Sequence, residues 1–540
     1  MITLKADIVS EFLILSTIMA IFVLIIIYFY SLEMKEERNN SRFIVTCILM
    51  YISLFSGFCQ NLPGEIHPDA RFSKAELLNQ PLEGFSGIWY ANQPSGDEYV
   101  YKYSGGLSTY TANHNPMAIY SPEVNRTYFC YGAVNEQGSL IHAVSFFDHK
   151  TGEVISPVGV LDKKTNDAHD NPVISIDSEG YIWLFSTSHG TSRPSYIHRS
   201  VRPHDISSFE PVSPVKIENG RKVPLDNFSY LQVYFQKGKG FIGLFTHYVV
   251  KDLKHGKKSV RVISWMTSQN GIEWSEWKDI ASIEEGHYQT SCPVNGKVGT
   301  SFNYHPNLKD EPGLNYRTNL YFIQTKDFGK NWQAAEGIEV NLPLTEIANP
   351  ALVKNYASEG LNVYINDVAY DKRGYPAILY ITSKNYQAGP SSGPQKWNIA
   401  HWDGKRWNIS YVTSSDNNYD MGSLYIEDDG TWRIIGPTEQ GPQLFNTGGE
   451  MAMWESMDGG KTWKKSMQLT SNSIYNHSYS RKPLYAKEEF YAFWADGHGR
   501  KRSESRLYFA TKTGEVYCLP EKMKGERMKP ELFKLTPSLK

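Results

Sequence analysis

The chain has 540 residues, of which 55 are Lys or Arg and 57 are Asp or Glu, so its formal net charge at pH 7 is −2. This balance excludes the broad electrostatic attraction by which nucleic-acid-binding proteins recognise phosphate backbones. Aromatic residues make up 14% of the chain, a composition that suits β-structure and the stacking of sugar rings.

Two uncharged runs, at 12–30 and 43–58, mark the first sixty residues. Met34 could be the start of a cleaved signal peptide with a charged n-region, or the first run could be a membrane anchor, since it is just long enough to span a bilayer. We favour the signal peptide. In both interpretations the rest of the chain is exported to the periplasm, the cell surface or the medium, and a retained leader would engage the membrane.

Three regions are expected: a signal peptide or anchor over 1–60, a catalytic body over 61–520 and a basic C-terminal tail over 521–540. Within the body, the segment 84–106 precedes the first full repeat. We expect it to supply a strand to the last sheet and so close the fold.

Hairpin-turn sequences of one kind recur through the body at a spacing of about 58 residues, which indicates an internal repeat. Short alternating strands flank each turn. Seven such units predict an all-β fold, a seven-bladed β-propeller. The turns lie near residues 123, 179, 239, 296, 372, 429 and 488.

A second signature supports the same fold. The stretches 325–332 (TKDFGKNW) and 456–463 (SMDGGKTW) follow the Asp-box pattern, and 267–274 (TSQNGIEW) is a degenerate copy. In each, the acidic or amide side chain can accept backbone N–H bonds and the Gly permits a positive φ. These loops are structural and carry no catalytic information.

Two histidines flank the second hairpin. An antiparallel ladder folded about Ser178–Gly180 places His169 opposite His189, about 5 Å apart at Cβ. The same reasoning pairs Tyr230 with His247 in the third unit and His477 with His498 in the last.

The residues just before each first strand should open on one face of the propeller, and several of them are polar rings. They should converge on one mouth. His287, Cys292 and His305 match no compact zinc motif, and we interpret them as structural. The converging rings are His114, His169, Tyr230, His287, Tyr288 and His477.

Histidine and tyrosine without paired carboxylates suit the β-elimination of a uronic acid. A His with a pKa near 6.5 can remove the proton at C5, and a Tyr, near 10, stays protonated and can protonate the departing oxygen at C4. The carboxylate of the sugar must be neutralised, and the enolate-like intermediate stabilised, by positive charge or hydrogen bonds.

The body resembles the bacterial neuraminidase repeat (Asp-box) propellers that include the ulvan lyases. The stretches that carry the resemblance are DAHDNPV, GYIWLFSTSH, SYLQVY, GHY and GGEMAMWESMDGGKTW. It implies a polysaccharide lyase acting on a uronate-containing, ulvan-like polysaccharide. His169 or Tyr230 would transfer the protons, and His189 and Tyr288 would orient the sugar.

One position departs from the family pattern, because His247 stands where the resemblance leads us to expect an arginine that neutralises the carboxylate. Either His247 is protonated, or Arg193 or Arg317 reaches into the site, or the substrate is not the usual one of the family. Asn171 and His114 complete the expected substrate contacts.

Two other functions stay open. A sialidase-like glycoside hydrolase shares Asp boxes but requires an arginine triad and a Tyr paired with Glu, and a non-catalytic carbohydrate-binding propeller shares the fold alone. We expect a monomer whose partner is an acidic polysaccharide, with no nucleic acid. No metal or cofactor is required for the chemistry, and a structural Ca²⁺ or Zn²⁺ is left open.

Overall fold

The computed structural model describes residues 75–107, 113–309 and 315–533. The hydrophobic leader expected over 1–60 lies outside these residues. In the part of the chain that is described, no helix is both long and apolar enough to cross a membrane.

Antiparallel sheets make up almost all of the described chain. Five of them have four strands each, one has five and one has seven. They are, in chain order, β1 (Glu76–Pro81), β4 (Ala118–Ser121), β5 (Arg126–Val134), β6 (Leu140–Asp148), β7 (Glu153–Ile155), β8 (Val158–Asp162) and β36 (Arg527–Met528); β9 (Pro172–Ile176), β10 (Ile182–Ser186), β11 (Tyr196–Ser200) and β12 (Phe209–Val212); β15 (Ser229–Gln236), β16 (Gly240–Leu253), β17 (Gly256–Ser268) and β19 (Lys278–Ala281); β20 (Gln289–Val294), β21 (Lys297–Tyr304), β22 (Thr318–Thr325) and β23 (Leu352–Lys354); β24 (Asn362–Tyr370), β25 (Pro376–Ser383), β26 (Gln395–Trp402) and β27 (Trp407–Ser415); β28 (Ser423–Ile426), β29 (Trp432–Glu439), β30 (Glu450–Ser456) and β31 (Lys464–Gln468); and β32 (Asn476–Arg481), β33 (Ala492–Gly497), β34 (Leu507–Ala510), β35 (Val516–Cys518) and β37 (Glu531–Leu532).

Smaller elements connect or flank these sheets. A short 3-10 helix, η3, precedes β9 and becomes important below. The smaller elements are β2 (Tyr90–Pro94), β3 (Tyr101–Gly105), η3 (Ala168–Asp170), β13 (Val215–Glu218), β14 (Arg221–Pro224), β18 (Glu273–Trp274), η5 (Ala357–Glu359) and η6 (Pro390–Ser392).

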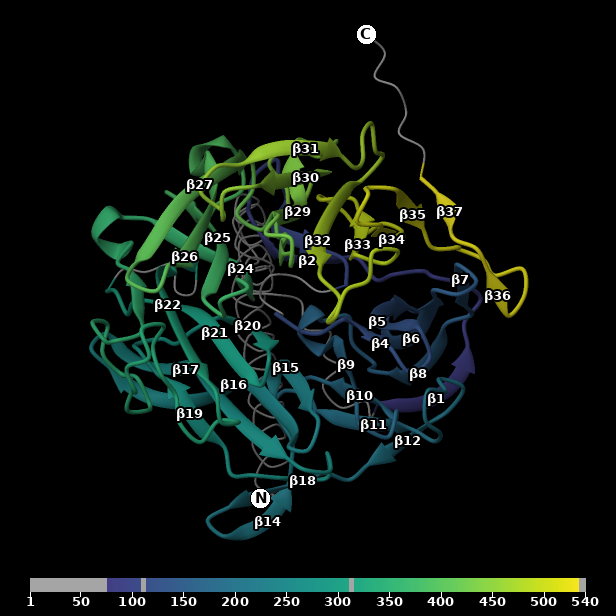
Figure 1. Ribbon diagram of the computed structural model, residues 1–540, viewed down its shortest axis with the longest axis horizontal. Coiled ribbons are helices and arrows are strands. Elements are labelled where there is room, and N and C mark those ends of the chain that lie inside the picture. The colour runs from purple at the N-terminus through teal and green to yellow at the C-terminus, as the bar shows by residue number, and fades with distance from the viewer. Residues whose placement is uncertain (1–74, 108–112, 310–314, 534–540) are drawn as a thin grey trace, which may run out of the picture. The chain divides into compact units, whose positions relative to one another are not determined.

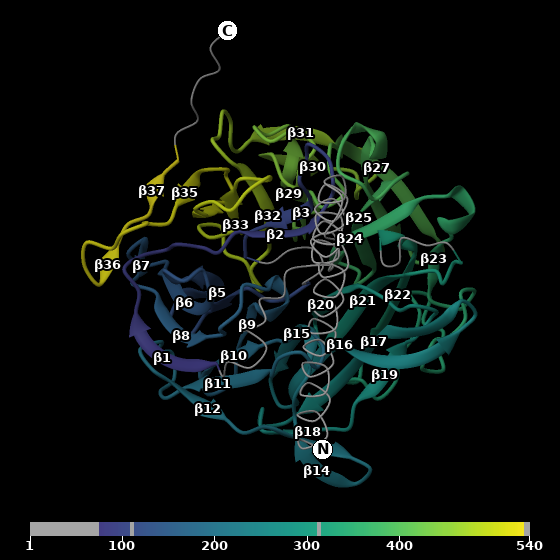
Figure 2. The same ribbon diagram turned by 180° about the vertical axis from the view of Figure 1, so that it is seen from behind.

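The seven larger sheets follow one another around a common centre, as Figures 1 and 2 show from opposite sides. The first strands of successive sheets contact each other, from β4 to β9, β15, β20, β24 and β28. The circle closes where Ile119 of β4 bridges to Leu484, which follows β32. The strands named above, together with β32, therefore lie nearest the centre.

Every predicted hairpin turn joins the central strand of one larger sheet to the next strand of that sheet, β4 to β5 in the seven-stranded one, so the repeat is confirmed. The expectation that the segment 84–106 gives a strand to the last sheet is wrong, because it forms its own hairpin, β2–β3. In the predicted tail, β36 pairs with β7 and β37 pairs with β35.

The Asp boxes adopt the expected turns. Asp458 Oδ1 accepts the backbone N–H groups of Lys461 and Thr462, and the Trp463 indole N–H donates to the Gly460 carbonyl. Thr325–Trp332 uses Asp327 in the same way, and the degenerate copy uses Asn270. Each box thus closes the link after the third strand of its sheet.

Bulges interrupt three of the central strands. Register shifts occur between Ser229 and Gln232 in β15, between Ile365 and Asp367 in β24, and between Ser478 and Arg481 in β32. A bulge re-aims the side chains at that point of the strand. Because these strands lie nearest the centre, their bulges decide which side chains point there.

Burial keeps several histidines neutral, and this predicts a measurable pH dependence of stability. Burial lowers the pKa of His198 in β11 to about 4, with a further contribution from Lys163. Between pH 6.5 and 4 the unfolded chain binds a proton that the folded chain does not, so this residue makes stability fall as the pH is lowered. The effect is on the order of 3 kcal/mol.

Urea unfolding of the wild type and of His198→Gln at pH 7 and pH 4.5 tests this expectation. The variant should lose less stability on acidification than the wild type does. Equal losses in the two proteins would contradict the assignment to His198.

Candidate active site

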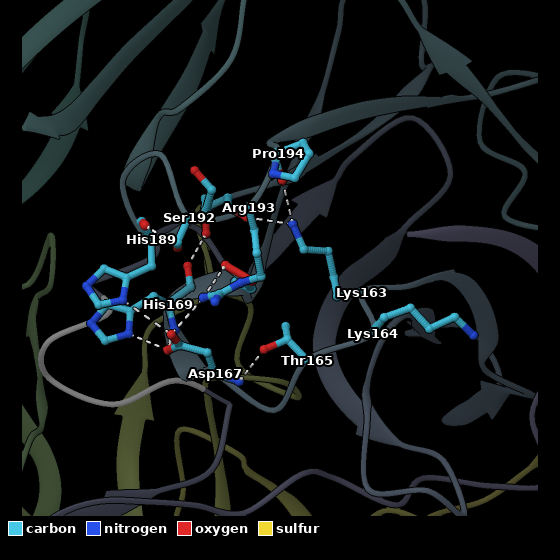
Figure 3. A network of polar contacts seen from close by, with 12 residues as sticks. Lys163, Lys164, Thr165, Asp167, His169, His189, Ser192, Arg193 and Pro194 are labelled. Carbon is cyan, nitrogen blue, oxygen red and sulfur yellow. Dashed lines mark hydrogen bonds and ion pairs between the residues drawn. The ribbon is translucent and has the colours of Figure 1, made fainter. Parts of the chain in front are cut away.

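The carboxylate of Asp167 faces both histidines of the predicted pair. Nδ1 of His169 hydrogen-bonds to Oδ1, and Nδ1 of His189 lies 3.3 Å from Oδ2. The two rings stack with centroids 3.8 Å apart and 2° between their planes. Figure 3 shows the second nitrogen of each ring on the side away from Asp167. The predicted juxtaposition of the rings is confirmed.

The local sequence explains this arrangement. Asp167 caps η3, because its Oδ1 accepts the backbone N–H of His169 at 3.0 Å. The ladder of β9 and β10 keeps the predicted register and ends with Pro172 opposite Ser186. The Thr187 hydroxyl then donates to the His169 carbonyl at 2.5 Å. The capped turn and the end of the hairpin are thereby held together.

The electrostatics of the pair favour a neutral imidazole beside an ionised carboxylate. Burial opposes the ionisation of Asp167, but the charges and hydrogen bonds of His169 and His189 outweigh it and hold the pKa of its carboxyl well below the usual range. Burial lowers the pKa of His169, although Asp167 partly offsets this. With Nδ1 donating to Asp167, the Nε2 lone pair of His169 is available to accept a proton.

Tyr230 approaches the same ring. Its centroid lies 5.3 Å from that of His169 in an edge-on contact, and its side chain is almost fully buried. The bulge in β15 gives Tyr230 a φ of 51°, a conformation that is uncommon outside glycine and tends to occur at functional sites. Burial, followed by the neighbouring Tyr248 and Tyr288, raises the pKa of its phenol well above the ordinary value.

Tyr248 extends the cluster on the other side of His189. Its hydroxyl lies 3.5 Å from that of Tyr230, and its ring centroid lies 6.1 Å from that of His189. A Cβ on Gly190 would come within 3.1 Å of the Tyr248 ring, so the glycine permits this approach. The pair of phenols forms one wall of the site.

Arg261 brings positive charge to these phenols. It lies opposite Tyr248 in the β16–β17 hairpin, and its guanidinium carbon is 5.4 Å from the Tyr248 ring and 5.7 Å from the Tyr288 ring. Its Nε is buried and has no hydrogen-bond partner in the described part of the chain. This arginine can therefore bind an anionic group that enters the cluster.

A second arginine, Arg317, also lies near the Tyr288 ring. The guanidinium carbon of Arg317 is 5.0 Å from the Tyr288 ring, 4.9 Å from the Tyr364 ring and 5.8 Å from the Tyr419 ring. The structure thus brings Arg317 and Tyr288 together as predicted. Tyr364 and Tyr419 add two phenols that the sequence alone did not indicate.

His247 is not opposite Tyr230. The bulge puts Thr246 opposite Ser229, and alternation then turns His247 to the other face of the sheet. There its Nε2 lies 3.2 Å from Asp279 and its ring packs edge-on against Trp277. The expectation that His247 contacts the substrate is therefore corrected.

Three further residues that were predicted to contact substrate bind instead to the η3 turn that carries His169. Arg193 is committed to two carboxylates of the η3 turn, with its ion pair to Asp167 at 2.7 Å. Asn171 is fully buried and bonds to Ala168 and to the Tyr90 hydroxyl. Fully buried His114 points its Nε2 at the His169 carbonyl, 3.1 Å away. They hold His169 in place.

The expected pairing of His477 with His498 is also wrong, because Asp496 lies opposite His477. His477 accepts the indole N–H of Trp494 at 3.0 Å. The ring of His498 instead lies near that of Tyr475. These histidines belong to the packing of the last sheet.

Asp167, His169 and His189 are the group of described residues whose ligand types and spacing suit a metal ion such as Zn²⁺. In the structure, the His169 ring hydrogen-bonds directly to Asp167. The arrangement is that of a carboxylate orienting two imidazoles.

The structural interpretation of the other histidine group agrees with its contacts. Nδ1 of His287 lies 2.7 Å from the carbonyl oxygen of Asn303, and its Nε2 accepts the backbone N–H of Ile283. His305 uses Nδ1 on the Gly286 carbonyl at 3.0 Å.

Three of the residues missed above had a readable signal. Gly256 begins β17 directly after the β16–β17 turn, and a ladder folded about that turn pairs Tyr248 with Arg261. Asp167 stands two residues before His169, at the position of a helix cap. Tyr364 lies in β24 and Tyr419 in the connection between β27 and β28, both far along the chain, and no local pattern marks them.

Replacing Asp167 by Asn tests its control over the histidines. Because the carboxylate raises the pKa of His169, its loss should lower that pKa further and remove the fixed Nδ1–H tautomer. Titration of the imidazole resonances by NMR measures both effects. Asp429→Asn, in a turn remote from the site, serves as the control, and an unchanged His169 titration in Asp167→Asn would refute the contact.

Comparison with known proteins agrees with this picture. Residues 157–415 match the BNR repeat-containing family. An ulvan lyase of Nonlabens ulvanivorans is 25% identical over 420 residues, which cover 69% of this chain and 81% of the relative. The ulvan lyase PL25 of Pseudoalteromonas sp. (strain PLSV) is 22% identical over 350 residues, covering 59% and 68%.

Solved structures show the same fold. A PL25 ulvan lyase matches with a TM-score of 0.60 at 16% identity, covering 80% of this chain and 96% of that one. Another structure of the PL25 lyase, described as bound to -[GlcA(1-4)Rha3S]-, matches equally well. Part of the chain, residues 157–415, is therefore similar to the BNR repeat-containing family, and the chain is a distant homologue of the ulvan lyases over most of its length.

Proposed function

We propose that the protein is a polysaccharide lyase that cleaves a uronate-containing, ulvan-like polysaccharide by β-elimination. The observation that carries the proposal is the contact between the Asp167-oriented ring of His169 and the phenol of Tyr230. The homology to ulvan lyases over most of the chain supports it. We also infer that the seven larger sheets are the blades of a seven-bladed propeller with this site on its axis.

His169 acts as the general base. Its Nε2 takes the proton from C5 of the uronate, and the electrons of the C5–H bond form the C4–C5 double bond. Burial lowers the pKa of His169, so the imidazole stays unprotonated at pH values somewhat below its ordinary pKa. His189, stacked on the ring, and Tyr248 would orient the sugar.

Tyr230 acts as the general acid. The C4–O bond breaks, and the phenol donates its proton to the departing oxygen. Its raised pKa keeps the proton in place until negative charge develops on that oxygen. The two groups transfer protons at neighbouring carbons, which their edge-on contact at 5.3 Å permits.

The uronate carboxylate would bind at Arg261, with Arg317 as a second cation nearby. Removal of the C5 proton moves negative charge into this carboxylate, so a fixed guanidinium stabilises the intermediate more than the substrate. Arg261 thereby takes the part that the sequence comparison assigned to the position of His247. It does so from the neighbouring strand, opposite Tyr248.

The remaining expectations belong to the same proposal. The partner is an acidic polysaccharide. The proposed proton transfers use side chains of the protein and need no metal or cofactor. The protein acts as a monomer. It is exported, with the leader either cleaved or kept as an anchor.

Ultraviolet absorbance of the 4,5-unsaturated product tests the reaction class. The full chain is incubated with glucuronate- or iduronate-containing polysaccharides, and absorbance should rise. His169→Ala and Tyr230→Phe should each lower the rate by roughly 10²- to 10⁴-fold with the fold retained. New reducing ends without absorbance would indicate a hydrolase, and neither signal would indicate a binding protein.

Arg261→Ala tests the assignment of the carboxylate partner. Loss of a charged hydrogen bond should reduce kcat/KM by about 10- to 100-fold, mainly through kcat, and Arg261→Lys should recover part of it. Arg199→Ala is the matched control, since Arg199 lies on β11 and pairs with Glu210. Unchanged kcat in Arg261→Ala would exclude this role.

A further inference from the structure

The loop that carries His189 lies just beyond the end of the β10–β11 ladder. The last rung of that ladder pairs Ser186 with Tyr196, so the residues between them, 187–195, lie outside it and are called here the His189 loop. In a continued register Ser188 would face Pro194, which has no backbone N–H to contribute to a ladder. The two stems of the loop therefore need another contact to hold them together.

A buried lysine from the neighbouring sheet supplies this contact. Nζ of Lys163 donates to the Thr187 carbonyl at 3.0 Å and to the Pro194 carbonyl at 2.9 Å. Figure 3 shows the side chain of Lys163 reaching Pro194. The ammonium also lies 5.1 Å from the centre of the Tyr196 ring. One cation thus links both stems of the loop just past the last rung of the ladder.

The backbone of Lys163 is fixed in the first sheet, while its side chain is buried against the second. The residue follows β8 directly, and its N–H donates to the Leu140 carbonyl at 3.0 Å. Only 3% of its surface is exposed, and burial lowers the pKa of its ammonium, although Asp170 partly offsets this. A buried ammonium is costly unless it is hydrogen-bonded. Because the two loop carbonyls supply these bonds, the buried cation and the closed loop stabilise each other.

The loop in turn presents two side chains to the same carboxylate oxygen of Asp167. Nδ1 of His189 lies 3.3 Å from Oδ2, and the Arg193 guanidinium donates to that oxygen at 2.7 Å. The His189 ring stacks on that of His169 in this position. The separation of the loop stems therefore fixes where both side chains meet Asp167.

We propose that Lys163 is a positioning residue of the candidate active site, whose hydrogen bonds to both stems of the loop hold His189 against Asp167 and toward the substrate. The link between the stems rests on the contacts of Lys163 alone. Its effect on turnover rests on the proposed lyase reaction, in which His189 orients the sugar. Lys163 acts through His189 and does not touch the reacting atoms.

Hydrogen exchange of the full chain, followed by mass spectrometry, tests the link without turnover. Lys163→Met keeps an unbranched side chain and removes its donors. The His189 loop, in which the Gly190 amide donates to the Ser229 hydroxyl at 2.9 Å, should then exchange about tenfold faster, while the β9–β10 ladder keeps its protection. Lys164→Met is the matched control, because Lys164 is the next residue and pairs instead with two carboxylates of the first sheet.

Wild-type exchange of the loop in Lys163→Met would refute the link. Faster exchange throughout β9 and β10 would mean that Lys163 stabilises the whole sheet, which also overturns a positioning role. If the Met variant does not fold, Lys163→Gln takes its place. The Gln amide still donates but lies one bond closer to the backbone, so it should lose a loop carbonyl and show the same local increase in exchange.

Kinetics on the polysaccharide test the consequence for the reaction. Lys163→Met should lower kcat/KM by about tenfold, mainly by raising KM, and Lys163→Arg, which keeps a cation with several donors, should recover part of the loss. A loss confined to kcat would contradict action through His189. If the wild type cleaves no uronate-containing polysaccharide, the lyase proposal fails, and the exchange experiment still decides whether Lys163 holds the loop.

Discussion

The carboxylate of Asp167 joins the parts of the site that matter most. It caps η3, accepts the Nδ1 protons of His169 and His189, and pairs with Arg193. A buried anion is costly unless it is hydrogen-bonded and paired, and these contacts supply Asp167 with both its hydrogen bonds and its ion pair. The position and tautomer of the candidate base follow from this one carboxylate, whereas burial keeps the base neutral.

Bulges in the central strands also determine where side chains of the site point. The bulge in β15 turns Tyr230 toward the histidines and sends His247 to the other face of its sheet. The bulge in β24 takes Asn366 out of the regular ladder. A regular strand would alternate its side chains and place Tyr230 and His247 elsewhere. One structural device thus shapes the site.

Homology and geometry answer different questions about this protein. The relationship to ulvan lyases indicates the reaction class, and identities of 25% and below leave the individual contacts to the structure. In the proposed mechanism the carboxylate partner is Arg261, one strand away from His247. A cation can keep its place in a site while its position in the sequence changes, because neighbouring strands present side chains to the same space.

The sequence by itself determined the repeat, the all-β class, the Asp-box turns and the juxtaposition of His169 and His189. These are local properties, set by alternation, turn residues and hairpin register. Only the tertiary structure decided that Arg193 supports the site, that Tyr419 joins it and that the C-terminal tail completes two sheets. Such contacts join residues far apart in the chain, and a single bulge reverses the facing of a strand, so neither can be read from local pattern.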